Sequence, residues 1–290
     1  MEEREQILTA TTQNDFLEYA RKSCMKNGSY CAWRYGEWGL PSIQDTFWAL
    51  RIYKKLFLKP PSSDRTRRWL ESETPRILSE GDSENIYYAF FSFQMLSLLF
   101  PWKEDWLTPL SESLLVDSSA LLETEARIRA SCLWLSLEKN AGRPLPLIRN
   151  RIAHHLQKWL SEVQEDRISL DLPAWGMLVE GRLRAGLPAN PIEPRILDRY
   201  RDPEGGYRLT PDSQVDTMEC LWWGTRLDRR YFGREIPACK EVEGKVGSYQ
   251  AKNGGYGPRP GAIPDLASTG MALDILLTIR AQPTQSKRIS

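Results

Sequence analysis

The sequence is poor in histidine, has no excess charge of either sign and lacks a long apolar segment. Its two histidines, His154 and His155, are adjacent, and neighbouring residues on a helix point about 100° apart, so the pair does not form a metal site. With 39 basic and 38 acidic residues the net charge is +1, which gives no electrostatic signature of nucleic-acid binding. The longest apolar run, residues 86–100, is shorter than the ~20 residues of a membrane-spanning helix.

The cysteines are also too few and too scattered to form a disulfide framework. There are five, an odd number, with no Cys-x-x-Cys spacing, and the first residues lack the apolar core of a signal peptide. We therefore expect reduced thiols and a cytoplasmic protein. The apolar run 86–100 is interpreted as a buried core helix; a membrane-dipping helix is the alternative, which leaves peripheral membrane contact open.

Aromatic residues, in contrast, are abundant. The chain has 11 Trp, 11 Tyr and 8 Phe among its 290 residues, which is more rigid aromatic surface than a helical core normally requires. We expect part of this surface to line a cavity.

The chain repeats a short motif that opens apolar helices. Gly-Gly-Tyr occurs at 205–207 and at 254–256, and an aspartate lies eleven residues after the first glycine of each. A looser copy, Gly-Ser-Tyr at 28–30, opens the chain, and three weaker copies keep only an acid before an apolar helix. Aspartate is a preferred N-cap because it accepts hydrogen bonds from the free N–H groups of the first turn. The six acids are Asp45, Asp82, Asp117, Asp171, Asp216 and Asp265.

Amphipathic stretches alternate with these six apolar helices. No segment shows sustained period-two alternation, so strands are not expected. Apolar helices enclosed by amphipathic ones predict an all-α fold, an (α/α)6 toroid of six inner and six outer helices. One domain over residues 1–281 and a flexible basic tail at 282–290 are expected, with an open solenoid as the alternative. The amphipathic stretches are 12–25, 62–79, 101–115, 144–163, 191–201 and 236–251.

Residues 254–273 resemble the repeat of protein prenyltransferase β subunits and squalene-hopene-type cyclases. The segment 205–223 is similar, and Gln250 before the second Gly-Gly-Tyr is similar to the cyclases' glutamine-aromatic motif. The resemblance is only architectural over most of the rest of the chain. It implies an α/α toroid with a central aromatic funnel that holds an isoprenoid chain.

The chain departs from that family at the family's catalytic positions. Asp216 matches the first zinc ligand, but Met218 and Ser268 stand where the resemblance implies the cysteine and histidine ligands. One carboxylate does not hold catalytic zinc, which needs about three protein ligands, so we expect no cofactor. The diphosphate-binding cations fall on Thr210 and Ser213, and neither Asp-x-Asp-Asp nor Asp-Asp-x-x-Asp occurs.

Two groups of residues are candidate site residues. Parallel inner helices would bring Asp45, Asp216 and Asp265 to one rim, where a carboxyl with a raised pKa could act as a catalytic acid; plain N-capping is the alternative. Aromatic residues in the first two turns of the inner helices would line a funnel for a substrate, or pack between the layers. The aromatic candidates are Trp48, Tyr88, Trp175, Trp222 and Trp223.

Three functions fit these patterns. The first is a divergent terpene cyclase-like or prenyltransferase-like enzyme that acts on or binds an isoprenoid or other apolar small molecule. The second is a non-catalytic toroid that binds a lipid or a partner protein, as a subunit of a larger assembly would. The third is a carbohydrate-active (α/α)6 barrel, which needs two carboxylates about 5–10 Å apart, a role open to Asp45 and Asp216.

Overall fold

A computed structural model describes residues 8–32, 40–101, 121–141, 145–236 and 238–281. The regular structure of these residues is helical, accompanied by isolated β-bridges. The prediction of an all-helical fold is therefore confirmed for this part of the chain. The helix start expected at Asp117, nearly all of the stretch 101–115 and the predicted tail 282–290 lie outside the described residues.

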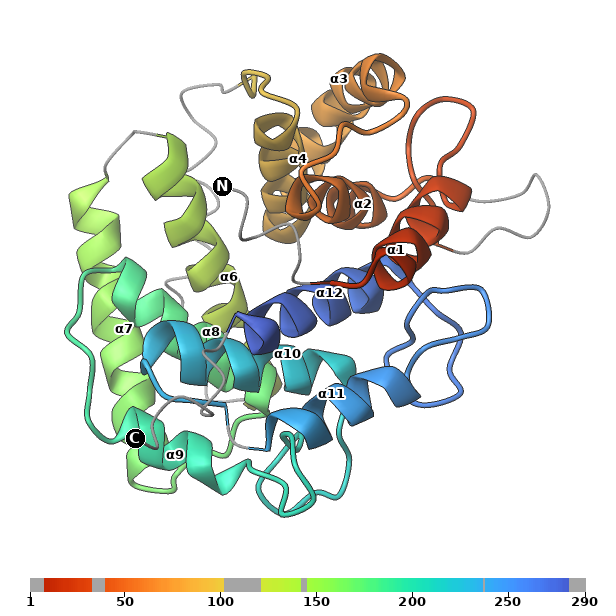
Figure 1. The fold of residues 1–290 in the computed structure, drawn as a ribbon. Helices are drawn as coiled ribbons and strands as arrows, with labels where there is room; N and C mark the ends of the chain where they lie inside the picture. Colours follow the sequence, from red (N-terminus) through yellow and green to blue (C-terminus); the bar gives the residue numbers. More distant parts are fainter. Residues whose placement is uncertain (1–7, 33–39, 102–120, 142–144, 237, 282–290) are drawn as a thin grey trace, which may run out of the picture.

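Two sets of helices alternate along the chain (Figure 1). The even-numbered helices are α2 (Ile43–Lys55), α4 (Ser83–Met95), α6 (Leu121–Ala141), α8 (Leu172–Arg184), α10 (Met218–Arg226) and α12 (Leu266–Arg280). The odd-numbered helices are α1 (Ala10–Lys22), α3 (Ser63–Glu80), α7 (Pro146–Gln164), α9 (Glu193–Arg199) and α11 (Cys239–Ser248). A π-helical turn, η2 (Leu227–Tyr231), extends α10.

The contacts among the even-numbered helices close on themselves. Helix α2 packs against α4, α4 against α6, α6 against α8, α8 against α10, α10 against α12, and α12 returns to α2. The odd-numbered helices pack against members of this cycle: α1 against α2 and α12, α3 against α4, α7 against α6 and α8, and α11 against α12. Figure 1 shows α1, α3, α7, α9 and α11 at the periphery.

Burial distinguishes the two sets. Helix α8 is buried over 172–176 and 178–182, and α12 is buried over most of its length, whereas α3 buries only one stripe of side chains. A helix that is apolar on most sides is stable only when neighbours cover it on most sides. The even-numbered helices therefore carry most of the hydrophobic stabilisation, about 1.5–3 kcal/mol for each large apolar side chain buried.

The repeated turns and caps explain where the helices begin. Gly205 and Gly254 adopt φ of 93° and 86°, the left-handed region that glycine enters without strain. The side chains of Asp82, Asp171 and Asp265 accept hydrogen bonds from the first-turn N–H groups of α4, α8 and α12, as predicted.

Two of the predicted caps are wrong. Ser42 caps α2 and Thr217 caps α10, so Asp45 lies three residues after its cap and Asp216 lies one residue before its cap. Both carboxylates are thereby available for other interactions. No helix in the described ranges combines the length and the apolar character needed to cross a bilayer.

Candidate functional site

The N-terminal ends of four even-numbered helices share one opening, which we name the mouth pocket. It has a volume of 790 Å³ and is bounded by the starts of α2, α4, α10 and α12 together with Arg129 of α6. An adjoining hollow between α4, α6 and α8 shares Glu84 and Arg129 with it. The side chains that line the mouth pocket include Asp45, Glu84, Tyr88, Arg129, Glu219, Arg259, Asp265, Ser268 and Met271.

A smaller space, the aromatic cavity, adjoins the mouth pocket. Its volume is 100 Å³, and Tyr88, Arg129, Glu219 and Met271 line both spaces. The mouth pocket and the aromatic cavity therefore lie next to each other, with these four side chains between them. The aromatic side chains that line the cavity are Phe47, Trp48, Tyr87, Tyr88, Trp222 and Trp223.

Helical periodicity explains how α2 builds both spaces. Asp45, Trp48, Arg51 and Lys55 are spaced by three, three and four residues, so they lie one above another on a single face. Asp45 lines the mouth pocket, while Trp48 and Arg51 line the aromatic cavity. One face of a single helix thus changes from acid to ring to cation along its length.

Two other helices place polar, apolar and charged residues in a comparable order. On α10, Glu219 lines both spaces, and Trp222 and Arg226 line the aromatic cavity. On α12, Ser268 lines the mouth pocket, Met271 lines both spaces, and Asp274 follows three residues later. The interior therefore has a layer of polar mouth residues, a layer of rings and methionine, and a charged layer.

The rings pack edge to face within the cavity. The centroids of Trp48 and Trp222 lie 6.2 Å apart at 81°, and those of Trp222 and Trp223 lie 4.9 Å apart at 71°, the arrangement that the ring quadrupoles favour. Glycines on the adjacent helices seat two of these rings. A Cβ on Gly270 would lie 2.5 Å from the Trp48 ring, and one on Gly176 would lie 2.3 Å from the Trp223 ring.

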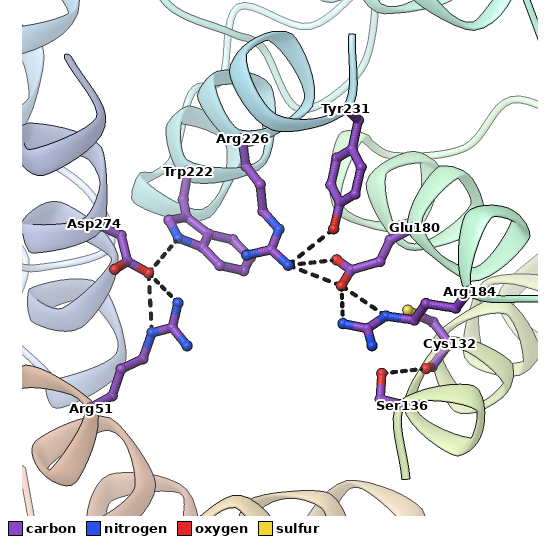
Figure 2. Close-up of polar contacts among 9 residues, drawn as sticks. All are labelled: Arg51, Cys132, Ser136, Glu180, Arg184, Trp222, Arg226, Tyr231 and Asp274. Carbon is purple, nitrogen blue, oxygen red and sulfur yellow. Dashed lines mark hydrogen bonds and ion pairs between the residues drawn. The ribbon is translucent and has the colours of Figure 1, made fainter. Parts of the chain in front are cut away.

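An ion pair between α2 and α12 lies below the rings (Figure 2). The Nε and Nη2 atoms of Arg51 donate to Oδ2 of Asp274 at 3.1 and 2.5 Å, and Nε1 of Trp222 donates to the same oxygen at 3.2 Å. Nζ of Lys55 lies 3.1 Å from Oδ1. Burial alone would raise the pKa of the Asp274 carboxyl, but Arg51 and Lys55 outweigh it and lower that pKa to about 2.

A second network joins α8 to α10 on the other side of Trp222 (Figure 2). Nη2 of Arg226 donates to both carboxylate oxygens of Glu180 at 2.9 Å and to the Tyr231 hydroxyl at 3.1 Å, and Arg184 also pairs with Glu180. Burial opposes ionisation of Glu180, but the two guanidinium groups prevail and lower its pKa. The Arg226 guanidinium lies 5.0 Å from the centroid of the Trp222 ring, within cation–π range. We name Arg51, Glu180, Arg226 and Asp274 the polar layer.

Two of the three predicted acids meet at the mouth pocket. Oδ2 of Asp45 accepts the Ala32 N–H at 3.0 Å. Burial raises the pKa of Asp45 to about 6, the Ala32 N–H opposes this rise, and the nearby charge of Asp265 adds to it. Asp265 is held by the N–H and hydroxyl of Ser268 at 2.6 and 2.9 Å, yet burial still raises its pKa.

The third predicted acid is separate from this pair. Asp216 accepts hydrogen bonds from Nζ of Lys245 and from the Tyr249 hydroxyl, both at 2.8 Å. Lys245 also pairs with Asp202 at 2.6 Å. Asp216 is not part of the lining of the mouth pocket, and its carboxylate links the segment before α10 to α11.

Four of the five predicted aromatic residues lie in the aromatic cavity: Trp48, Tyr88, Trp222 and Trp223. The Tyr88 hydroxyl donates to Oε1 of Glu84 at 3.0 Å, which directs its polar end towards the mouth. Trp175 is fully buried in the core and is not part of the cavity lining.

Sequence reasoning missed Glu219 and the polar layer. Glu219 lies where the two spaces meet, and burial raises the pKa of its carboxyl against the opposing charge of Arg129. The sequence does contain a pattern that indicates them. Glu219, Arg226 and Asp274 interrupt apolar helices, and they stand three or four residues from the rings or methionine of the same face.

The described residues contain no group of three His, Cys, Asp or Glu side chains placed to hold a metal ion. Of the positions where the resemblance implies zinc ligands, Met218 is buried and Ser268 is hydrogen-bonded to Asp265. The expectation that the chain uses no cofactor stays a prediction. Comparison with known proteins finds no matching family and no curated protein of significant similarity.

Proposed function

We propose that this chain is an (α/α)6 toroid, a divergent relative of the prenyltransferase β subunits and squalene-hopene-type cyclases, with one domain over residues 1–281. The closed cycle of contacts among α2, α4, α6, α8, α10 and α12 supports the toroid. So do the adjoining hollows bounded by the starts of several of these helices. The repeats at 205–223 and 254–273 support the relationship.

Its ligand is an isoprenoid or a similar apolar chain held in the aromatic cavity. The single observation that carries this proposal is that an open pocket of 790 Å³ adjoins an inner cavity whose lining includes six aromatic side chains. Binding pockets for small molecules have volumes of about 300–1,000 Å³ and are mostly apolar with few polar groups. The mouth pocket has the required size, and the cavity has the required surface.

Its reaction is cyclase-like protonation of the ligand at the mouth. The proton leaves the carboxyl of Asp45 and the π electrons of an alkene form the new C–H bond, which leaves a cation on the other alkene carbon. The ring faces of Trp48 and Trp222 stabilise that cation, and loss of a proton to a carboxylate completes the reaction. Asp45, with a pKa of about 6, holds a proton on about a tenth of molecules at pH 7 and on about half at pH 6.

Charge at the mouth favours protonation over ionisation of a diphosphate. The lining cations Arg129 and Arg259 face four carboxyl side chains there. A diphosphate needs an excess of cations or a bound metal to offset its charge, whereas a neutral alkene needs a protonated acid. The four acids are Asp45, Glu84, Glu219 and Asp265.

The test is incubation of the purified protein with squalene, farnesol, and farnesyl and geranylgeranyl diphosphates, followed by mass-spectrometric product analysis. The proposal predicts cyclised or rearranged products from the wild type and loss of at least 100-fold of that activity in Asp45→Asn. Asp216→Asn is the matched control and retains activity, because its carboxylate is outside the mouth pocket. Loss of activity in Asp216→Asn but not in Asp45→Asn would contradict the proposal.

Saturable binding without product from any of these compounds would support the second candidate, a non-catalytic toroid that binds a lipid. Neither product nor binding would reject the isoprenoid proposal altogether.

A further inference from the structure

Helices α2 and α12 border open space at both of their ends. A second hollow, the far pocket, has a volume of 800 Å³ and lies at the C-terminal ends of α2 and α12. Lys55 and Thr278 line it from the same helix faces that carry Asp45 and Ser268 at the mouth. Asp45 and Lys55 are ten residues apart on α2, or about 15 Å at the helical rise of 1.5 Å per residue.

An ion pair lies between the aromatic cavity and the far pocket. Arg51 lines the cavity, and Asp274 lines the far pocket. The two are joined by hydrogen bonds of 3.1 and 2.5 Å. Trp222 contacts the pair from the cavity side and Lys55 from the far side, so the pair has one space on each side of it.

We infer that the Arg51–Asp274 pair closes the aromatic cavity at its inner end and limits the length of the apolar chain that the cavity admits. This inference rests on the proposed function, because it names the length class of the isoprenoid. The Glu180–Arg226 pair closes the neighbouring part of the same layer.

An apolar chain does not displace this layer, because no part of the chain replaces the lost interactions. Asp274 is 8% exposed and holds Arg51, Lys55 and Trp222. A methyl or methylene group in the place of Arg51 would remove one of the two cations that face the buried carboxylate. The layer also fixes the rings above it, since the Arg51 guanidinium lies 5.5 Å from the centroid of Trp48.

The cavity volume indicates how much of a chain fits above the layer. At 100 Å³ it is smaller than the engineered cavity of about 150 Å³ that binds benzene. Such a space suits one five-carbon isoprene unit, with the rest of the chain in the mouth pocket. The protein therefore takes the terminal unit of an isoprenoid into the rings and stops it at Arg51.

The test removes both charges of the partition together. The double variant Arg51→Met/Asp274→Leu replaces the salt bridge with apolar side chains and leaves neither charge alone, and Lys55, 43% exposed, is free to turn to solvent. The matched control is Arg182→Met/Glu193→Leu, a buried pair at 2% and 1% exposure that lines neither space. Binding of geraniol, farnesol and geranylgeraniol is measured by titration calorimetry.

The length profile is the affinity of a protein for the three alcohols in order of chain length. In the wild type and the control, affinity is expected to rise with chain length and then to stop rising at the same alcohol. The double variant is expected to bind the next longer alcohol at least tenfold more tightly than wild type. An unchanged length profile in a folded double variant would overturn the partition and leave the proposed function standing. A wild type that binds none of the alcohols would overturn both.

A measurement on the wild type covers the case of a double variant that does not fold. Farnesol with a diazirine at its terminal isoprene unit is photolysed on the protein, and the labelled residues are identified by mass spectrometry. Label on Trp48, Trp222 or Met271 is expected. Competition with unlabelled farnesol shows which labelling comes from the bound chain. If it abolishes labelling of Thr278 in parallel with labelling of Met271, the chain passes the layer, and the inference is overturned.

Discussion

Substitution of Asp45 by asparagine is expected to stabilise the protein at alkaline pH. Burial raises the pKa of Asp45 from 3.8 to about 6, so between these values the folded state binds more protons than the unfolded state. The free energy of unfolding therefore falls as pH rises from about 4 to about 6. At 1.36 kcal/mol per pKa unit, the total loss is about 3 kcal/mol.

Asparagine removes this loss because it is neutral at every pH. Its side-chain oxygen still accepts the Ala32 N–H, which is 3.0 Å from Oδ2 of Asp45, although a neutral acceptor contributes roughly 1 kcal/mol less than a charged one. Asp45→Asn is therefore expected to exceed the wild type by roughly 1–3 kcal/mol at pH 8 and to equal it or fall slightly below it at pH 4.

The assay is urea unfolding of both proteins at pH 4 and pH 8, with Asp216→Asn as the matched control. Asp216 pairs with Lys245 and accepts from Tyr249, so its loss is expected to destabilise the protein at pH 8. The reasoning is refuted if Asp45→Asn is less stable than the wild type by the same amount at both pH values. That result would mean that the Asp45 carboxylate is no less stable in the folded state than in the unfolded one.

Two further predictions concern the ring layer and the polar layer. Gly270→Ala places a Cβ 2.5 Å from the Trp48 ring and is expected to cost about 1–3 kcal/mol and to weaken ligand binding. Gly244→Ala, in open space on α11, is expected to add about 0.5–1 kcal/mol; denaturation of both variants checks the pair. Asp274→Asn leaves Arg51 without its carboxylate and is expected to cost roughly 3–5 kcal/mol at pH 7. Since the pKa of Asp274 is lowered to about 2, its stabilisation is lost as pH falls from about 4 to about 2, and unfolding curves across that range should show this loss in the wild type only.

Most helix starts were predictable because their signals are local. A glycine with positive φ and a short polar side chain at the next helix start act through neighbouring backbone groups, as Gly254 and Asp265 show. The cap of α2 was misassigned because serine and aspartate are nearly equal N-caps, and Ser42 and Asp45 stand three residues apart. Backbone geometry makes Ser42 the cap, which leaves Asp45 for the mouth pocket.

The aromatic lining was predictable only in part, because periodicity gives the spacing of a face but not its direction. Trp48 and Trp222 face the cavity, whereas Trp175, also near the start of an even-numbered helix, packs in the core. That difference depends on which neighbours lie on each side of α8. The polar layer was missed because charged residues usually face solvent, and only the partners on other helices show that Arg51 and Glu180 point inward.

The most direct test of the ligand site is a crystal structure of the protein with farnesol at saturating concentration. Continuous density is expected from the mouth pocket into the space between Trp48, Tyr88 and Trp222, ending above the Arg51–Asp274 pair. The proposed site is contradicted if the protein binds farnesol in solution but its crystals show density only in the far pocket beside Phe57 and none between the rings.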